Sequence, residues 1–275
     1  FGDTTTTLAT ALAARKMNIP LVHIESGVRI YDNNMPEEIN RIVVDRIASL
    51  NVCVTNTGKD NLYLEGFDSR SIRSKVKVCG DLMYEAYLSK MSQLKDQESQ
   101  IVKEYNLTSN KYILCTAHRA SNVDNLSNLK NIIEALNVIN KITPIICPIH
   151  PRTKAKIDKE NLRLEFITCN PLSYTETLLL LKDCMYTITD SGGLLREAYF
   201  SKKKSILILE SPLWPEINNH SCSLNIAPIK DDIINGFYKI NDLKSDFSKN
   251  IFGDGNTASR IVDLLEETIN LENNI

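Results

Sequence analysis

Short apolar runs bounded by helical patterns repeat along nearly the whole chain of 275 residues. The runs predict strands at 19–25, 51–55, 75–80, 111–116, 143–149, 164–168, 185–189 and 205–209. Helical spacing of apolar residues predicts helices at 5–17, 36–50, 57–66, 123–140, 153–160, 174–183, 194–200 and 257–271. Strands that alternate with helices pair in parallel, so the pattern predicts an α/β fold with two doubly wound sheets facing a cleft. Such sheets bind ligands at the carboxyl ends of their strands.

Composition and charge argue against several classes of protein. The formal net charge is −2, whereas a nucleic-acid-binding protein needs a concentrated basic face. The one tight basic run, Lys202–Lys204, is typical of a solvated turn. No apolar stretch reaches the roughly 18 residues of a membrane span. The seven cysteines form no Cys-x-x-Cys pair, so we expect reduced, mostly buried thiols in a cytoplasmic protein, with no disulfide framework or zinc site.

The most specific local feature is Thr-Asp-Ser-Gly-Gly at 189–193, where a strand gives way to a helix. Gly192 and Gly193 let the backbone approach a ligand, and the first helical N–H groups point outward at the positive end of the helix dipole. Together with the Ser191 hydroxyl they favour a phosphate site; the alternative is a tight turn with a helix N-cap. Glu197 is suited to accept from ribose hydroxyls, or alternatively to stabilise the first helical turn.

Basic residues follow two other strands. His118 and Arg119 come after the strand 111–116, and His150 comes after the strand 143–149. A titratable ring beside a fixed cation suits acid–base work near a phosphate. The alternative is a capping histidine and a surface arginine.

The first third of the chain supplies carboxylates at strand ends. Asp3 lies at the end of what reads as the tail of a strand, Glu25 ends the strand 19–25, and Glu37 opens a helix together with Glu38. A single acid in such a place is often an N-cap or a solvated first-turn residue. Their shared position predicts that these carboxylates face the basic loops.

Nine motifs in fixed order carry a family resemblance. They are GDTTTT (2–7), HIESG (23–27), MPEEINR (35–41), GDLMYEA (80–86), AHR (117–119), HPRT (150–153), TDSGG with Glu197 (189–197), WPE (214–216) and GDG (253–255). Over essentially its whole length the chain resembles the non-hydrolysing UDP-N-acetylglucosamine 2-epimerases.

The resemblance implies a GT-B fold with two Rossmann-like lobes and an active-site cleft between them. Residues 1–89 would form an N-terminal lobe, 90–256 a UDP-binding lobe reached through the polar connection 90–110, and 257–275 a helix crossing back to the first lobe. The implied substrate-binding residues are Arg119, His150, Ser191, Gly192, Gly193 and Glu197. The implied catalytic residues are Asp3, Glu25, Glu37 and His118.

The implied reaction converts UDP-N-acetylglucosamine to UDP-N-acetylmannosamine by elimination and re-addition of UDP, for surface polysaccharide synthesis. It needs a base at C2, carboxylates that stabilise positive charge on the sugar, and cations beside the leaving diphosphate. It requires no metal and no redox cofactor. The resemblance also implies a homodimer.

Three departures from the family leave alternatives open. The family's N-terminal Gly-Thr-Arg-Pro-Glu segment is absent, so we expect an incomplete first lobe. Segment 210–216 replaces an Arg-Asp and Thr-Glu stretch of the family, is shorter and has the opposite charge at Glu210, and Leu195-Arg196 replaces Gln-Glu. The chain is therefore an active epimerase, an inactive or truncated nucleotide-sugar binder, or an epimerase of another UDP-sugar. A GT-B glycosyltransferase fits less well, because Asp3, Glu25, Glu37 and His118 match the epimerases.

Overall fold

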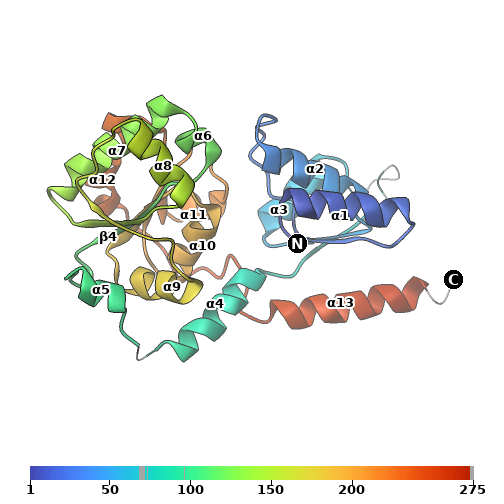
Figure 1. Cartoon of the computed structure of the whole chain (residues 1–275). Helices are drawn as coiled ribbons and strands as arrows, with labels where there is room; N and C mark the ends of the chain where they lie inside the picture. Colours follow the sequence, from blue (N-terminus) through green and yellow to red (C-terminus); the bar gives the residue numbers. More distant parts are fainter. Residues whose placement is uncertain (68–71, 73, 96, 273–275) are drawn as a thin grey trace. The chain divides into compact units, whose positions relative to one another are not determined.

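The computed structural model describes residues 1–67, 72, 74–95 and 97–272, in two compact units (Figure 1). Unit 1 comprises Phe1–Leu88 and Lys249–Ile275, and unit 2 comprises Ser89–Ser248. Residues 249–256, predicted to belong to the second lobe, group with unit 1. Positions 68–71, 73, 96 and 273–275 of the predicted segments 1–89, 90–110 and 257–275 lie outside the described residues.

Unit 1 contains a parallel sheet of three strands in the order β1-β2-β3. Its elements are α1 (Thr5–Lys16), β1 (Val22–Ser26), α2 (Pro36–Ile47), β2 (Leu50–Cys53), α3 (Asn56–Leu64), β3 (Lys75–Val78), the first part of α4 (Leu82–Gln93) and α13 (Thr257–Glu272). Pro36 occupies the first turn of α2, where its missing N–H costs no hydrogen bond.

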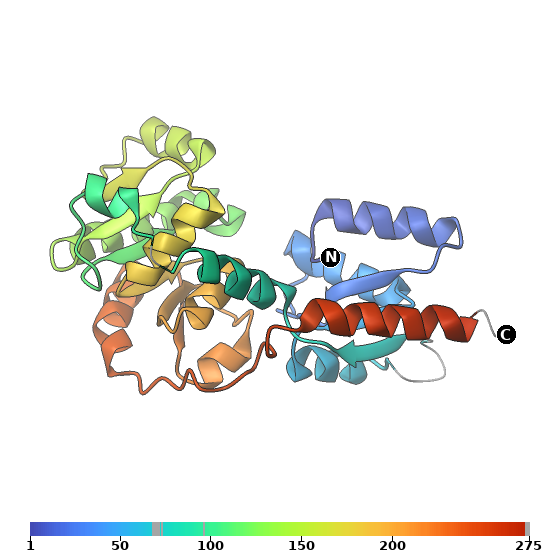
Figure 2. The same ribbon diagram turned by 90° about the horizontal axis from the view of Figure 1, so that it is seen from below.

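Alternate residues of β2 face opposite sides of this sheet. Leu50 and Val52 pack against Ile261 of α13, which runs along the sheet (Figure 2). Cys53 packs on the other side against Leu62 of α3. Because both faces are covered, the strand is apolar along most of its length, as a buried parallel strand requires.

Unit 2 contains a parallel sheet of six strands in the order β6-β5-β4-β7-β8-β9. Its elements are α5 (Gln100–Glu104), β4 (Ile113–Thr116), α6 (Ala120–Val123), α7 (Leu126–Asn140), β5 (Ile145–Pro148), α8 (Pro151–Lys159), β6 (Ile167–Cys169), α9 (Tyr174–Asp183), β7 (Tyr186–Thr189), α10 (Gly192–Phe200), β8 (Ser205–Ile208), α11 (Pro215–Asn219), β9 (Ser223–Ile226), α12 (Lys230–Lys239) and the 3₁₀ turn η1 (Ile240–Asp242). The predicted α/β class with parallel sheets is confirmed.

The strand order of unit 2 reverses direction between β4 and β7. From β4 the chain moves outward through β5 to β6, and it then returns to place β7, β8 and β9 on the other side. This is the doubly wound arrangement, whose ligands bind outside the carboxyl ends of the strands at the reversal point.

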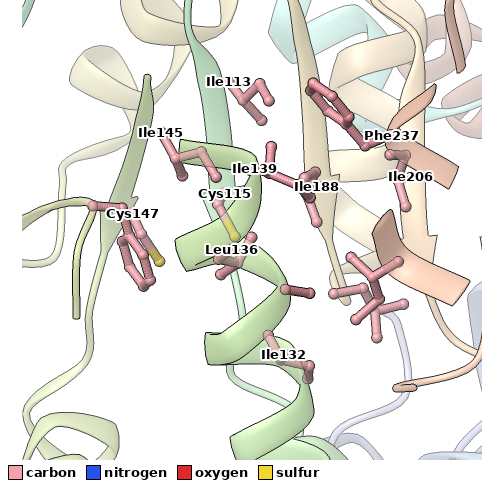
Figure 3. Packing of buried hydrophobic residues seen from close by; sticks show 14 of the residues in the cluster. Ile113, Cys115, Ile132, Leu136, Ile139, Ile145, Cys147, Ile188, Ile206 and Phe237 are labelled. Carbon is pink, nitrogen blue, oxygen red and sulfur yellow. The ribbon is translucent and has the colours of Figure 1, made fainter. Parts of the chain in front are cut away.

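The core of unit 2 lies between the sheet and two neighbouring helices. Ile132, Leu136 and Ile139 of α7 lie over Ile113 and Cys115 of β4 (Figure 3). Helix α12 adds further apolar side chains to the same cluster. Helix α10 contacts β7 and β8, and it carries the turn that was singled out in the sequence.

Several segments differ from their predictions. The polar connection 90–110 contains the end of α4 and all of α5, and Leu94 within it is buried. The run Lys202–Lys204 is not simply solvated: Lys204 Nζ donates to the carbonyl oxygens of Ile240, Asn241 and Leu243. Within the described residues, no helix has both the length and the apolar character needed to cross a bilayer.

Candidate functional site

The predicted site residues divide between the two units. Asp3, Glu25 and Glu37 belong to unit 1. The others belong to unit 2: His118, Arg119, His150, Ser191, Gly192, Gly193 and Glu197. We call the predicted residues of unit 1 the acidic half and those of unit 2 the basic half of the predicted site.

In unit 1, Asp3 is held by α2. Its carboxylate Oδ2 accepts from Arg41, with the Arg41 Nε at 2.9 Å, and its backbone carbonyl accepts from Asn40 Nδ2 at 2.8 Å. Arg41 also donates to the buried Glu38, which in turn accepts from the backbone N–H groups of residues 30 and 31. Asp3 lies in a bend rather than a strand, although the neighbouring Gly2 N–H donates to Ile24 of β1 at 3.0 Å.

Glu25 and Glu37 lie on the elements next to Asp3. Glu25 is in β1 with a φ of 70°, at an irregularity in the pairing with β2 between Ile24 and Ser26. A left-handed backbone is uncommon for a non-glycine residue and often marks a functional position. Glu37 is exposed in the first turn of α2, where a carboxylate suits the helix dipole.

In unit 2, the fully buried carboxylate of Asp190 holds the basic loop in place. It accepts from the backbone N–H groups of His118 at 3.0 Å and Arg119 at 2.9 Å, and from Asn122 Nδ2 at 3.1 Å. The His118 ring, which is half-exposed, has its Nδ1 3.4 Å from Asp190 Oδ1. Arg119 Nε donates to the Asp190 backbone carbonyl. His118 and Arg119 are thus fixed beside the turn that begins α10.

The turn itself is ordered by hydroxyl groups. Ser191 Oγ caps α10 by accepting from the Leu194 N–H at 3.2 Å, and the Ser191 N–H donates to Thr189 Oγ1 at 2.9 Å. Thr189 and Thr116 share a hydrogen bond of 2.6 Å between neighbouring strands. Ser191 is therefore the N-cap of α10, which was the alternative to a phosphate role. The two roles are compatible, because the first N–H groups of a capped helix can also bind an anion.

The remaining predicted residues lie in unit 2 as follows. Glu197 is buried and is the sixth residue of α10, a helix with no acid in its first turn, so its alternative role as a first-turn residue is wrong. His150 is exposed and caps α8 by accepting from the Arg152 N–H at 3.3 Å. It follows β5, which neighbours β4, so His150 lies at the same sheet edge as His118.

The departures in segment 210–216 and in α10 meet in the structure. The Arg196 guanidinium stacks on the Trp214 ring at 4.5 Å, where a cation–π attraction operates. A Cβ on Gly192 would lie only 2.1 Å from Leu213 Cδ2. The segment is thus packed directly against the start of α10, and a side chain at position 192 would require Leu213 to move.

The sequence does not predict the residues whose hydrogen bonds fix the predicted site residues in position. Asp190 and Arg41 lie inside the motifs at 189–197 and 35–41, but the sequence pattern predicts no role for either of them. Asn122 gave no signal, because its bond to Asp190 joins positions 68 residues apart.

Each half has its own chemistry. Unit 2 offers Arg119, His118 and helix N–H groups, which suit an anion, at the reversal point of its sheet. Unit 1 offers the three carboxylates. Among the described residues, no group of three or more His, Cys, Asp or Glu side chains is arranged to hold a metal ion.

Comparisons with known proteins agree with one another. A sequence profile of the family described as UDP-N-acetylglucosamine 2-epimerase matches residues 1–266. A protein of Methanococcus maripaludis, named UDP-N-acetylglucosamine 2-epimerase homolog, is 35% identical over 96% of this chain and 74% of its own. A Pseudomonas aeruginosa protein, named UDP-2,3-diacetamido-2,3-dideoxy-D-glucuronate 2-epimerase, is 34% identical over 96% of this chain and 73% of its own.

A solved structure shows the same likeness in three dimensions. The crystal structure of Methanocaldococcus jannaschii UDP-GlcNAc 2-epimerase in complex with UDP-GlcNAc and UDP has a TM-score of 0.85 to this chain. It is 35% identical, and the match covers 97% of this chain and 74% of that one.

Proposed function

Because the chain belongs to the UDP-N-acetylglucosamine 2-epimerase family, a family of isomerases, we propose that it inverts C2 of UDP-N-acetylglucosamine to give UDP-N-acetylmannosamine. The observation that carries the proposal is the Asp190 network, which fixes His118 and Arg119 beside the N-terminus of α10. This arrangement suits the diphosphate of a UDP-sugar.

The proposed reaction proceeds by elimination and re-addition. The C2–H bond is not next to a carbonyl group, so direct removal of its proton is difficult. A carboxylate takes the C2 proton while the C1–O bond breaks, UDP departs with the electron pair of that bond, and a C1=C2 double bond forms. UDP then adds back to C1 while a proton reaches C2 from the opposite face. The products contain the same atoms as the substrate, so no external reactant is needed.

Each half of the candidate site has a proposed role. Arg119, His150 and the first N–H groups of α10 stabilise the charge on departing UDP, and Glu197 holds its ribose. Asp3, Glu25 and Glu37 supply the C2 base and stabilise positive charge at C1, and His118 transfers or stabilises a proton. The three acids remain equal candidates for the base.

A test of the diphosphate site is titration of UDP into the Ser191→Trp variant by calorimetry. The indole would occupy the space at the start of α10, so we expect UDP binding to be lost. The matched control is Ser173→Trp, because Ser173 caps α9 in the same way at an exposed position outside the predicted site. Unchanged UDP affinity in a folded Ser191→Trp protein would contradict the proposed site.

A second candidate substrate has one observation in its favour. The P. aeruginosa relative named for UDP-2,3-diacetamido-2,3-dideoxy-D-glucuronate is nearly as similar as the M. maripaludis one. Offering both UDP-sugars in equal amounts and measuring the initial rate of each conversion will decide between them. Binding of UDP without conversion of either sugar would favour a catalytically inactive binding protein.

We also propose a setting for the activity: the cytoplasm, the supply of surface polysaccharide precursors, and action as a homodimer. All seven cysteines are free thiols, as a reducing compartment favours. Sedimentation of the purified protein will test the dimer.

A further inference from the structure

A row of charged side chains, of which all but the partly exposed Glu65 are buried, lies behind the acidic half of the predicted site. Glu65 pairs with Arg29, whose Nε donates to Glu65 Oε1 at 2.6 Å. Arg29 Nη1 donates to Asp45 Oδ2 at 2.7 Å, and Asp45 Oδ1 faces His23 Nδ1 at 2.5 Å. His23, Arg29 and Asp45 are all at most 5% exposed. The row ends where His23 Nε2 meets the Gly2 carbonyl oxygen at 2.9 Å.

The two partners of the His23 ring determine its proton count. The Gly2 carbonyl can only accept, so Nε2 must carry a proton. A proton must also lie between Nδ1 and Asp45 Oδ1, because two lone pairs at that distance would repel. Arg29 and the Gly27 N–H both donate to Asp45, which favours its carboxylate form. The proton therefore belongs to the ring, and His23 is an imidazolium ion.

The surroundings of Arg29 agree with this charge pattern. Burial lowers the pKa of Arg29, but the hydrogen bond to Glu65 and the charges of Asp45 and Glu65 raise it above its ordinary value. The row thus alternates in sign from Glu65 through Arg29 and Asp45 to His23. Such pairing is what makes buried charges tolerable.

We propose that His23 is a positioning residue for Asp3: as an imidazolium ion bonded to Asp45, it fixes the Gly2 carbonyl and with it the Gly2–Asp3 peptide. The bond is one of three that tie this junction down, together with the Gly2 N–H to Ile24 and Asn40 to the Asp3 carbonyl. Gly2 has a φ of 69°, so the junction is a sharp turn that relies on these contacts. This inference rests on the proposed function for the role of Asp3, although the charge state of His23 does not.

The first test is nitrogen-15 NMR of the histidine rings in the unaltered protein at pH 7.5. The chain has four histidines, and the other three, at exposed or half-buried positions, are assigned by replacing each in turn. We expect both ring nitrogens of His23 to be protonated. A neutral His23 ring would overturn the proposal, and this result depends on no variant and no activity.

The second test compares two buried replacements in unit 1. His23→Gln keeps one donor for Gly2 but loses the charged link to Asp45. Asn51→Ala is the matched control, because Asn51 is buried and donates to the Asp45 carbonyl and to Ser74 without contacting the Gly2–Asp3 junction.

We expect His23→Gln to lower kcat for C2 proton exchange by at least about tenfold with an unchanged KM, because a displaced catalytic group slows the chemical step. Asn51→Ala should keep the wild-type kcat. Equal kcat values in the two variants would overturn the positioning role. If the unaltered protein has no activity, the proposed function fails. The positioning role is then tested by hydrogen exchange of the Gly2 amide. We expect this exchange to be faster in His23→Gln than in Asn51→Ala, and equal rates would overturn the positioning role.

Discussion

Asp190 shows how much of the basic half depends on one side chain. Two backbone N–H groups and the Asn122 amide point at its carboxylate, and both Asp190 and Asn122 are buried. Removing the acceptor leaves these donors without partners, which costs more than the hydrogen bonds themselves contribute. Asp190 therefore holds His118 and Arg119 in place, although it is not itself predicted to touch substrate.

We expect Asp190→Ala to lower the free energy of unfolding by about 2–4 kcal/mol, because three donors, among them the buried Asn122 amide, lose their acceptor. Asp124→Ala is the control: Asp124 pairs with Arg152 at an exposed position, and its loss should cost less than about 1 kcal/mol. Urea denaturation of both variants measures the difference. Equal losses would mean that the Asp190 network does not stabilise the loop.

The sequence predicted residues at strand ends better than it predicted their partners. His118 and Ser191 follow strands as predicted, because strand ends and glycine turns leave local patterns, whereas Asp3, predicted to lie at the end of a strand, is in a bend. The bond from His118 to Asp190 spans 72 positions and leaves no local pattern. For the same reason His23 and Asp45 could not be linked in advance, since they are 22 positions apart and come together only when α2 packs on β1.

At the scale of elements, most strands lie within two or three residues of their predicted bounds. The missed strand is β9, where Ser223 and Asn225 interrupt the apolar run and the strand lies at the edge of the sheet. Helix α4 is not predicted, because its residues belong to the GDLMYEA motif and to the polar connection 90–110. Tertiary packing determines the secondary structure of such segments, and the spacing of apolar residues in the sequence does not reveal that packing.

The close approach of α3 to β1 gives a prediction about an element. Gly27 has a φ of 77°, and a Cβ there would lie 2.1 Å from the Gly58 carbonyl oxygen of α3. We expect Gly27→Ala to cost about 2–5 kcal/mol, because left-handed strain and overpacking act together. Calorimetry of the thermal unfolding of the variant and of the unaltered protein measures this loss in the free energy of unfolding.

Gly66 provides the control for Gly27. Its φ of 85° is similarly left-handed, but a Cβ would meet nothing closer than Ile72 at 3.9 Å. Gly66→Ala should therefore show the strain alone, about 1–2 kcal/mol. If both replacements cost the same, the contact between β1 and α3 does not limit the side chain at position 27.

At the scale of the whole molecule, both units bury cysteines. Burial raises the pKa of Cys53 in unit 1 and of Cys184 in unit 2 to about 12, from an ordinary value of 9.0. The unfolded chain loses these protons near pH 9, whereas the folded chain keeps them. Their contribution to stability is thus complete below pH 9 and is lost as pH rises from 9 toward 12.

We expect the free energy of unfolding to fall above pH 9, by up to about 1.4 kcal/mol per pH unit for each such thiol. Denaturation at pH 8 and pH 10 measures the loss. Cys184→Ala removes one of these thiols, so its loss over this range should be smaller than that of the unaltered chain. An equal loss in the two proteins would contradict the titration of Cys184.

The family match extends over residues 1–266 and so includes both units. The proposed activity exchanges the C2 proton of a UDP-sugar. Proton NMR of UDP-N-acetylglucosamine incubated with the folded protein in D2O follows this exchange. We predict loss of the C2 proton signal and appearance of UDP-N-acetylmannosamine, both suppressed in Asp3→Asn. An unchanged spectrum, or release of free N-acetylmannosamine and UDP, would contradict the account.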